Sequence, residues 1–254
     1  MIDFIKIRID NPDIPGIRNN PRLEWIQRIN EKTGEVKEYT ATFHGLTFQI
    51  VDNQYLNISG SLHKHWNAIN EQGDQNYNDF KLLDLAGAIM NVCEWFNLLP
   101  GNCIIENFEF GVNVIPPIPV TEILRSVINH KGKPFNRQYS CKMNYLECSH
   151  RQYYLKMYDK GLQFDQGNKL RFEIKTRKME IVKPANIEKL SDLLIQDNMN
   201  RLGTILTGNF NDILFYDYTI PEKEINARER LVLTQGQNPL FWQEYKDTNP
   251  DNYF

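Results

Sequence analysis

The chain has few of the features that mark several common protein classes. It holds only four cysteines and no CxxC pair, which predicts free thiols in a reducing cytoplasm rather than a disulfide framework. A run of about 18 apolar residues, as a membrane span needs, is missing. The N-terminal MIDFIKIRID carries charges among its apolar residues and lacks the apolar core of a signal peptide. We therefore expect a cytoplasmic protein with no membrane partner.

An excess of positive charge is also absent. The formal net charge is -3, so any role in binding nucleic acid must depend on local charge. Glu173 and Glu180 are the only acids within one basic segment, and two lysines precede it. This stripe suits a phosphate backbone, although a solvated run of charges is the plain alternative. Its members are Lys156, Lys160, Lys169, Arg171, Lys175, Arg177, Lys178 and Lys183.

Composition and periodicity predict a folded α+β protein. With 254 residues and 41% hydrophobic residues, the chain can bury a core. We expect one domain over residues 1–254 or two β-rich halves, 1–115 and 116–254. The fold class is a central antiparallel β-sheet with helices packed on one face and a polar opposite face carrying the active site. Alternation predicts strands over Ile2–Ile9, Leu23–Ile29, Val36–Phe43, Leu46–Val51, Tyr55–Leu62, Ile104–Val114, Tyr139–Leu146, Gln152–Lys160 and Lys169–Lys178.

Helical spacing predicts three further segments. Apolar residues from Leu82 to Phe96 recur at helical intervals, with Asp79 as a possible cap before them. A short helix is expected over Thr121–Asn129, and the pattern is again helical from Asn186 onward.

Strand alternation gathers polar side chains on one face of several strands. It places Glu106 with Phe108 on one face of their strand and Glu109 on the other. The polar faces of the next strands hold tyrosines, cations and Glu173. Carboxylates can hold a divalent metal, cations can stabilise charge on a phosphate, and a tyrosine can act as a covalent nucleophile. An ordinary solvated sheet face is the alternative explanation.

The histidines offer a second possible metal site. His63 and His65 stand at i and i+2 on the predicted strand, so both rings are expected on one face, where two imidazoles can share a metal. HxH is a short pattern, and Lys64 stands where HUH nucleases have a bulky apolar residue. His44, His130 and His150 are expected to be isolated surface or loop residues.

Four ordered segments together resemble the rolling-circle replication initiators of filamentous phages, related plasmids and mobile elements. Each segment is weakly specific alone, but their order and spacing match the family over roughly residues 1 to 245. His65 departs from the pattern, because an aromatic residue is expected there. The segments are Ser59-Gly60-Ser61 with Lys64-His65-Trp66-Asn67, then Asn107 to Asn113, Leu155 to Gly161, and Leu170 to Lys175.

The resemblance implies a metal-dependent endonuclease that nicks a replication origin. A tyrosine would become linked to the 5′ phosphate, and the free 3′ hydroxyl would prime a polymerase before the strand is rejoined. The implied partners are single-stranded or supercoiled origin DNA and a host helicase and polymerase. Roles follow for named residues: Tyr158 as nucleophile with Tyr154 as the alternative; Lys160 as catalytic cation; Glu109, Glu173 and His63 as ligands of Mg²⁺ or Mn²⁺; Lys64, Lys156, Arg171, Lys175 and Arg177 as DNA contacts.

The sequence is also compatible with two other functions. A non-catalytic, DNA-binding regulatory relative would need the same basic face, so the sequence does not separate it from a nuclease. A protein-interaction role with a merely solvated sheet face would show no DNA binding even at low salt.

Overall fold

The computed structural model describes residues 2–29, 31–34, 36–140, 143–221, 223 and 225–248. They form two compact units. The first comprises Met1–Gly111 and Ile174–Thr204, and the second comprises Val112–Glu173 and Ile205–Phe254. Each unit therefore combines two stretches of chain that are far apart in sequence. Cys141 lies outside the described residues, so the expectation of a free thiol there has no structural counterpart.

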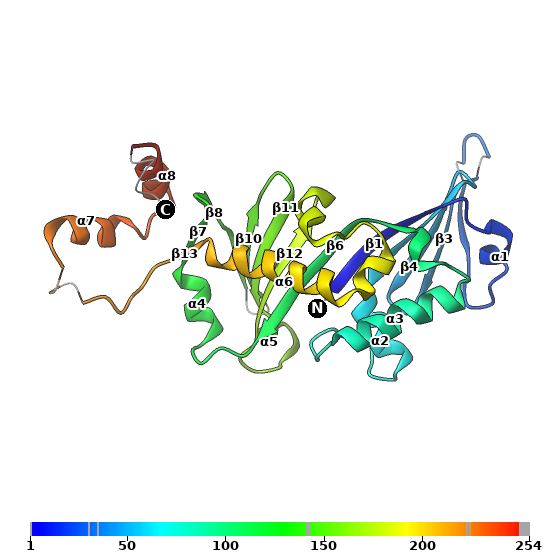
Figure 1. The fold of residues 1–254 in the computed structure, drawn as a ribbon, viewed down its shortest axis with the longest axis horizontal. Helices are drawn as coiled ribbons and strands as arrows, with labels where there is room; N and C mark the ends of the chain where they lie inside the picture. Colours follow the sequence, from blue (N-terminus) through cyan, green and yellow to red (C-terminus); the bar gives the residue numbers. More distant parts are fainter. Residues whose placement is uncertain are drawn as a thin grey trace. The chain divides into compact units, whose positions relative to one another are not determined.

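Figure 1 shows the helices and strands along the chain. In the first unit they are β1 Ile2–Asp10, α1 Ile14–Arg18, β2 Ile26–Ile29, β3 Val36–Phe43, β4 Leu46–Val51, β5 Tyr55–Ser61, α2 Leu62–Ile69, α3 Leu82–Trp95, and the 3-10 helices η1 Pro100–Asn102, η2 Met179–Ala185 and η3 Leu190–Leu194. In the second unit they are α4 Val120–Ser126, β7 Val127–His130, β8 Lys133–Pro134, β9 Asn136–Ser140, β10 Met143–Ser149, β11 Tyr153–Asp159, α5 Lys160–Phe164, β13 Ile213–Phe215, α7 Ala227–Gln235 and α8 Pro239–Thr248. Three elements contribute residues to both units: β6 Cys103–Val114, β12 Leu170–Thr176 and α6 Gln196–Asn211.

The predicted α+β class is confirmed. The main sheet has ten strands in the order β2-β3-β4-β5-β1-β6-β12-β11-β10-β9, and a small sheet has the order β13-β7-β8. The strand pairs within each unit whose register is described are antiparallel. The first unit therefore holds the run from β2 to β6, and the second holds β11, β10 and β9.

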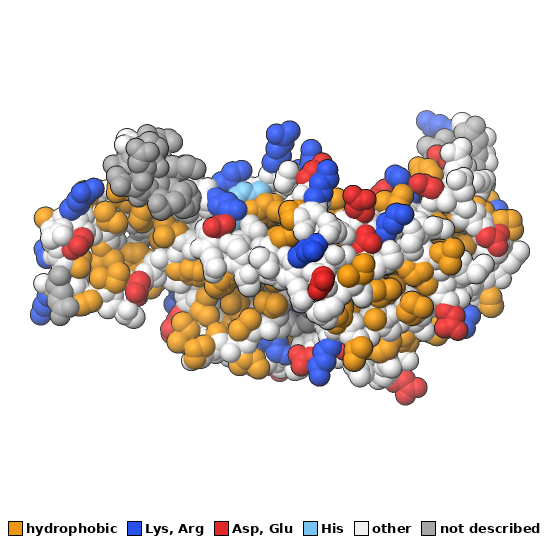
Figure 2. Space-filling view, in the orientation of Figure 1, with side chains coloured by type: hydrophobic (Ala, Val, Ile, Leu, Met, Phe, Trp, Pro, Cys, Tyr) orange, Lys and Arg blue, Asp and Glu red, His pale blue; other side chains and the backbone are white. Residues whose placement is uncertain are grey.

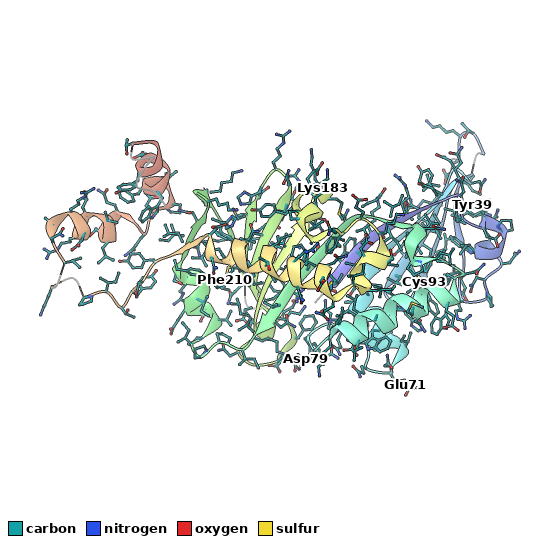
Figure 3. All side chains as sticks on the ribbon, in the orientation of Figure 1. Tyr39, Glu71, Asp79, Cys93, Lys183 and Phe210 are labelled. Carbon is teal, nitrogen blue, oxygen red and sulfur yellow. The ribbon has the colours of Figure 1, made fainter. Side chains whose placement is uncertain are left out.

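The core of the first unit follows from strand alternation. Ile7 of β1 pairs with Ile58 of β5, and both side chains are buried. Helices α2 and α3 lie together on one side of these strands, and α2 contacts β1 (Figure 1). Cys93, labelled in Figure 3, is a buried free thiol on α3. An apolar sheet face covered by two amphipathic helices accounts for most of this core.

Strand β6 departs from simple alternation. Lys6 pairs with Asn107 but Ile7 pairs with Ile105, so the register shifts at Glu106. A bulge of this kind changes the face to which the following side chains point. Phe108 is buried, whereas the Glu106 carboxylate lies 2.6 Å from Nζ of Lys6. The prediction that Glu106 and Phe108 share a face was therefore wrong.

The second unit has its own core. Leu146 of β10 pairs with Met157 of β11, and both are fully buried. Helix α4 packs against these two strands. Phe172 and Phe210 meet edge to face with ring centroids 5.2 Å apart, and Figure 3 shows Phe210 on α6.

The predicted helices exist with shifted boundaries. Asp79 does not cap α3, because the helix begins after Lys81, whose backbone N–H donates to Asp84 Oδ2 at 2.8 Å. Figure 3 shows Asp79 in the preceding loop. The short helix α4 ends at Ser126, and the chain then continues as β7. The spacing of apolar residues therefore predicted the helices but not β7, the short strand that follows α4.

Within the described part of the chain, no helix combines the length and the hydropathy that crossing a membrane requires.

Candidate functional site

A group of polar side chains lies on one face of β10, β11 and β12 in the second unit. Residues directly opposite each other in an antiparallel pair share a face. Tyr145 pairs with Tyr158, and Glu147 pairs with Lys156. We call the group formed by these four residues with Lys160, Arg171 and Glu173 the β10–β12 polar cluster.

Two tyrosines face each other in this cluster. The rings of Tyr145 and Tyr158 lie with centroids 5.9 Å apart, and both residues are partly exposed. The Tyr145 hydroxyl donates to Oε2 of Glu147 at 2.5 Å. A hydroxyl bonded to a carboxylate is positioned to lose its proton to that carboxylate. Tyr145 thus has the geometry of a nucleophile paired with a base.

Lys160 lies at the start of α5, directly after β11. The carboxylate of Asp159 accepts from the backbone N–H of Leu162 at 2.8 Å and so caps this helix. Lys160 is only 2% exposed, and its Nζ lies 5.7 Å from the centroid of the Tyr158 ring. The sequence predicted Lys160 as the last residue of the strand, whereas it is the first residue of the helix. Its ammonium group nevertheless lies beside Tyr158.

The base of the cluster is a buried ionic group. Arg171 Nε lies 2.8 Å from Oε2 of Glu173, and Lys156 Nζ lies 3.4 Å from Oε1. Burial by itself raises the pKa of Glu173, but Arg171, Lys156 and Lys160 outweigh that effect and lower the pKa. Arg171 also donates to Oδ1 of Asn113 at 3.3 Å. Glu173 is therefore a carboxylate held by cations.

The predicted carboxylate–histidine metal set does not fit this arrangement. Both oxygens of Glu173 already face cations, which would repel a divalent ion. In the first unit, Oε1 of Glu109 lies 2.9 Å from Nζ of Lys175. His63 is fully buried and its Nε2 is bonded to Asn78 Oδ1 at 2.5 Å. These side chains are therefore bonded to cations or to an amide rather than arranged as a set of metal ligands.

The prediction that His63 and His65 share a strand face was wrong. Both lie in helix α2, where residues two apart point in different directions. The Ser61 hydroxyl accepts from the backbone N–H of Lys64 at 3.1 Å and starts the helix at this point. His65 Nε2 is bonded instead to Asn91 Oδ1 at 3.1 Å, and burial lowers the pKa of this ring.

The predicted DNA contacts occupy different environments. In the first unit, Lys64 lies 3.2 Å from Asp74, Lys175 pairs with Glu109, and Arg177 is exposed. In the second unit, Lys156 is largely buried and Arg171 is 1% exposed. On the face of the first unit drawn in Figure 2, acidic and basic side chains are interspersed. Exposed Arg177 is thus better placed than Arg171 for a direct contact with phosphate.

Sequence reasoning missed two sets of residues. The region predicted as one strand, Tyr139–Leu146, is a hairpin of two strands, β9 and β10. Tyr145 and Glu147 both lie on β10, and their i, i+2 spacing places them on one face of it. That spacing was the signal available in the sequence. Among the described residues, one group could hold a metal through three side chains: the ligand atoms of His130, Cys148 and His150 lie within 4.8 Å of one another. The expectation that His130 is an isolated surface residue was wrong, because it is fully buried in β7.

The comparisons with known proteins give a likeness of fold. No family model matches the chain, and no curated protein matches it. A solved structure of a rolling-circle replication initiator protein from Geobacillus stearothermophilus is similar, with a TM-score of 0.51 and 12% identity over 94% of this chain and 96% of that chain. At this level of identity the match shows that the chain has a fold similar to that of a rolling-circle replication initiator.

Proposed function

We propose that this protein nicks one strand of a replication origin through a tyrosine and later rejoins it. The observation that carries the proposal is the hydrogen bond from the Tyr145 hydroxyl to Glu147, directly opposite Tyr158 and its neighbour Lys160. The fold similarity to a replication initiator supports the same class of reaction. Tyr158 is the nucleophile that the sequence favours, and Tyr145 is the tyrosine with a base.

The chemistry is written first for Tyr145, which has a carboxylate within hydrogen-bond distance. Its phenol oxygen attacks the phosphorus, its proton passes to Glu147, and the bond to the 3′ oxygen breaks. The 3′ oxygen takes up a proton from water while Glu147 returns its proton to the solvent, which leaves a 5′-phosphotyrosine link and a 3′ hydroxyl that can prime a polymerase. For Tyr158 the same bonds form and break, and the phenol proton passes to water. Lys160 and Lys156 are buried and largely buried, so they would stabilise the added negative charge on the phosphoryl oxygens through their electric field rather than by direct contact. Rejoining is the reverse attack by a 3′ hydroxyl.

One experiment tests both tyrosines. The full chain is incubated with single-stranded DNA from its own replicon, with Mg²⁺ or Mn²⁺ and with EDTA, and a denaturation-resistant protein–DNA adduct is measured. We expect Tyr145→Phe or Tyr158→Phe to abolish the adduct while DNA binding persists. Tyr154→Phe tests the alternative nucleophile, which lies on the same face of the same strand opposite Ser149. Tyr218→Phe is the matched control, because Tyr218 is an exposed tyrosine of the same unit outside the β10–β12 polar cluster. An undiminished adduct in the Tyr145→Phe/Tyr158→Phe double variant would overturn the assignment.

A second function has one observation in its favour. The carboxylate of Glu173 is paired with cations rather than open to a metal, as a non-catalytic DNA-binding relative would allow. That function predicts salt-dependent binding to origin DNA with no adduct under any metal condition. The same incubation separates the two, since binding and adduct formation are measured on one sample.

A further inference from the structure

Three potential metal ligands meet in the second unit away from the β10–β12 polar cluster. His130 is the last residue of β7, Cys148 lies in β10, and His150 directly follows β10. Figure 1 shows β7 and β10 in the same part of the fold. Because side chains alternate along a strand, Cys148 points to the face of β10 opposite from Tyr145 and Glu147. The three ligands therefore belong to a separate site.

The donor atoms converge on one point. His150 Nε2 lies 2.8 Å from His130 Nδ1 and 3.3 Å from Cys148 Sγ. In a tetrahedral zinc site, bonds of about 2.0–2.1 Å to nitrogen and about 2.3 Å to sulfur place ligand atoms roughly 3.4–3.7 Å apart. Small side-chain rotations that move the ligand atoms by fractions of an ångström would give that spacing. The hydrogen bond between the two imidazoles would then be replaced by bonds to the metal.

The surrounding groups keep both imidazoles neutral, which is the form that binds a metal. Burial is the largest cause lowering the pKa of His130 and of His150, each to about 4. Lys131 acts in the same direction on both rings, Lys133 does so on His150, and Asp212 opposes the effect at His130. Burial also raises the pKa of the Cys148 thiol to about 11. A metal would have to displace that proton, as metals do at coordinating thiols.

Neighbouring side chains hold the rings in place. The ring of Tyr153 stacks on that of His150 with centroids 4.7 Å apart, and its hydroxyl donates to Asn209 Oδ1 at 2.7 Å. The same Tyr153 ring also borders that of His130, with centroids 6.3 Å apart. One aromatic side chain therefore packs against both imidazoles and limits their movement.

We propose that His130, Cys148 and His150 form a binding site for a thiolate-preferring transition metal, with Zn²⁺ as the expected ion. Two imidazole nitrogens and one thiolate leave one tetrahedral position for water. Binding forms the metal–sulfur bond, breaks the S–H bond and releases one proton to solvent, with no change in oxidation state. The ion would join β7, and with it the sheet β13-β7-β8, to the end of β10. This inference is independent of the proposed nicking reaction.

The first test uses metal alone on the full chain. After chelation and dialysis, Co²⁺ is added under reducing conditions, and its absorption is recorded. We expect one Co²⁺ per chain with a thiolate charge-transfer band and tetrahedral ligand-field bands. Cys148→Ser should abolish the charge-transfer band, and His130→Gln or His150→Gln should weaken binding at least tenfold. Cys93→Ala and His44→Gln are matched controls that should bind normally. A band that survives Cys148→Ser, or no band in the unmodified chain, overturns the proposal.

A second measurement needs no variant and so does not depend on how a variant folds. X-ray absorption at the zinc edge of the Zn²⁺-loaded chain should show one sulfur at about 2.3 Å and nitrogen ligands at about 2.0–2.1 Å. Titration in weak buffer near pH 7 should release one proton per Zn²⁺ bound, from the Cys148 thiol. A zinc shell of oxygen and nitrogen alone excludes the site. The adduct assay depends on residues of the opposite face of β10, whereas the metal measurements depend on His130, Cys148 and His150. Failure of the metal site and failure of the nicking proposal are therefore distinguishable.

Discussion

Arg171 and Glu173 stand two residues apart on β12 and form a buried ion pair, with Nε and Oε2 at 2.8 Å. Their side chains share one strand face, and each is about as buried as a core leucine, at 1% and 2% exposure. Removing one member of such a pair leaves the other charge buried without its partner, which costs more than the pair itself contributes.

We expect Arg171→Met to lower the free energy of unfolding by about 3–5 kcal/mol, because Glu173 would lose its closest cation. The double variant Arg171→Met/Glu173→Leu should recover part of that loss, since no isolated charge then remains. Urea unfolding followed by circular dichroism measures both.

The control is an exposed ion pair. Asp74→Asn removes the partner of Lys64, and Asp74 is 76% exposed, so the expected change is below about 1 kcal/mol. A double variant that is less stable than Arg171→Met would contradict the account of the buried pair.

The lowered pKa of Glu173 gives a second prediction, a loss of stability in acid. Its pKa in the folded chain lies below the ordinary value of 4.5, because the nearby cations outweigh the effect of burial. The unfolded chain therefore takes up the proton first as the pH falls, and the contribution of Glu173, complete above about pH 5, is lost as the pH drops through the folded pKa. Unfolding free energies from pH 6 to pH 3.5 measure this loss. Glu173→Gln should show a shallower slope in that window, and an equal slope in both proteins would refute the prediction.

The segment from Ser61 to His65 shows where sequence reasoning was limited. The i, i+2 spacing of two histidines suits a strand, but Ser61 is also a favoured helix cap, and tertiary contacts decided between them. The Ser61 hydroxyl both caps α2 and donates to Asp3 Oδ1. The local pattern predicted the strand β5 correctly but could not give the residue at which it becomes a helix.

Long-range pairing accounts for the other differences. The bulge at Glu106 depends on how β6 meets β1, which alternation within one strand does not contain. The group of His130, Cys148 and His150 forms because β7 and β10 come together, although His130 and Cys148 are 18 positions apart in the sequence. Alternation did place Tyr158, Lys156 and Tyr154 on one face of β11, because that strand is regular.

The helix cap gives a third prediction. Ser61→Ala should lower the free energy of unfolding by about 1–2 kcal/mol, because the Lys64 N–H loses its acceptor and Asp3 loses a donor. Ser61→Thr keeps the hydroxyl and is the matched control, with an expected loss well below that of alanine. Thermal unfolding of the three proteins measures the order, and equal losses for alanine and threonine would show that the hydroxyl does not hold this helix end.

Gly161 gives the last prediction, because it fixes the position of Lys160. A Cβ at Gly161 would lie 1.6 Å from the carbonyl oxygen of Gly167 and 3.0 Å from the backbone nitrogen of Lys169. Both contacts are with backbone, and the Gly161 N–H itself donates to the Lys169 carbonyl at 3.1 Å, so the loop cannot yield without losing that bond. Gly161→Ala should therefore lower the free energy of unfolding by about 3 kcal/mol and move Lys160 away from Tyr158.

Gly101→Ala is the matched control, since nothing lies within 4 Å of a Cβ there. Urea unfolding gives the cost of each change, and adduct formation at a temperature where both variants are folded gives the effect on the site. If the Gly161 variant is as stable and as active as the Gly101 variant, then the close approach of these two loops does not position Lys160.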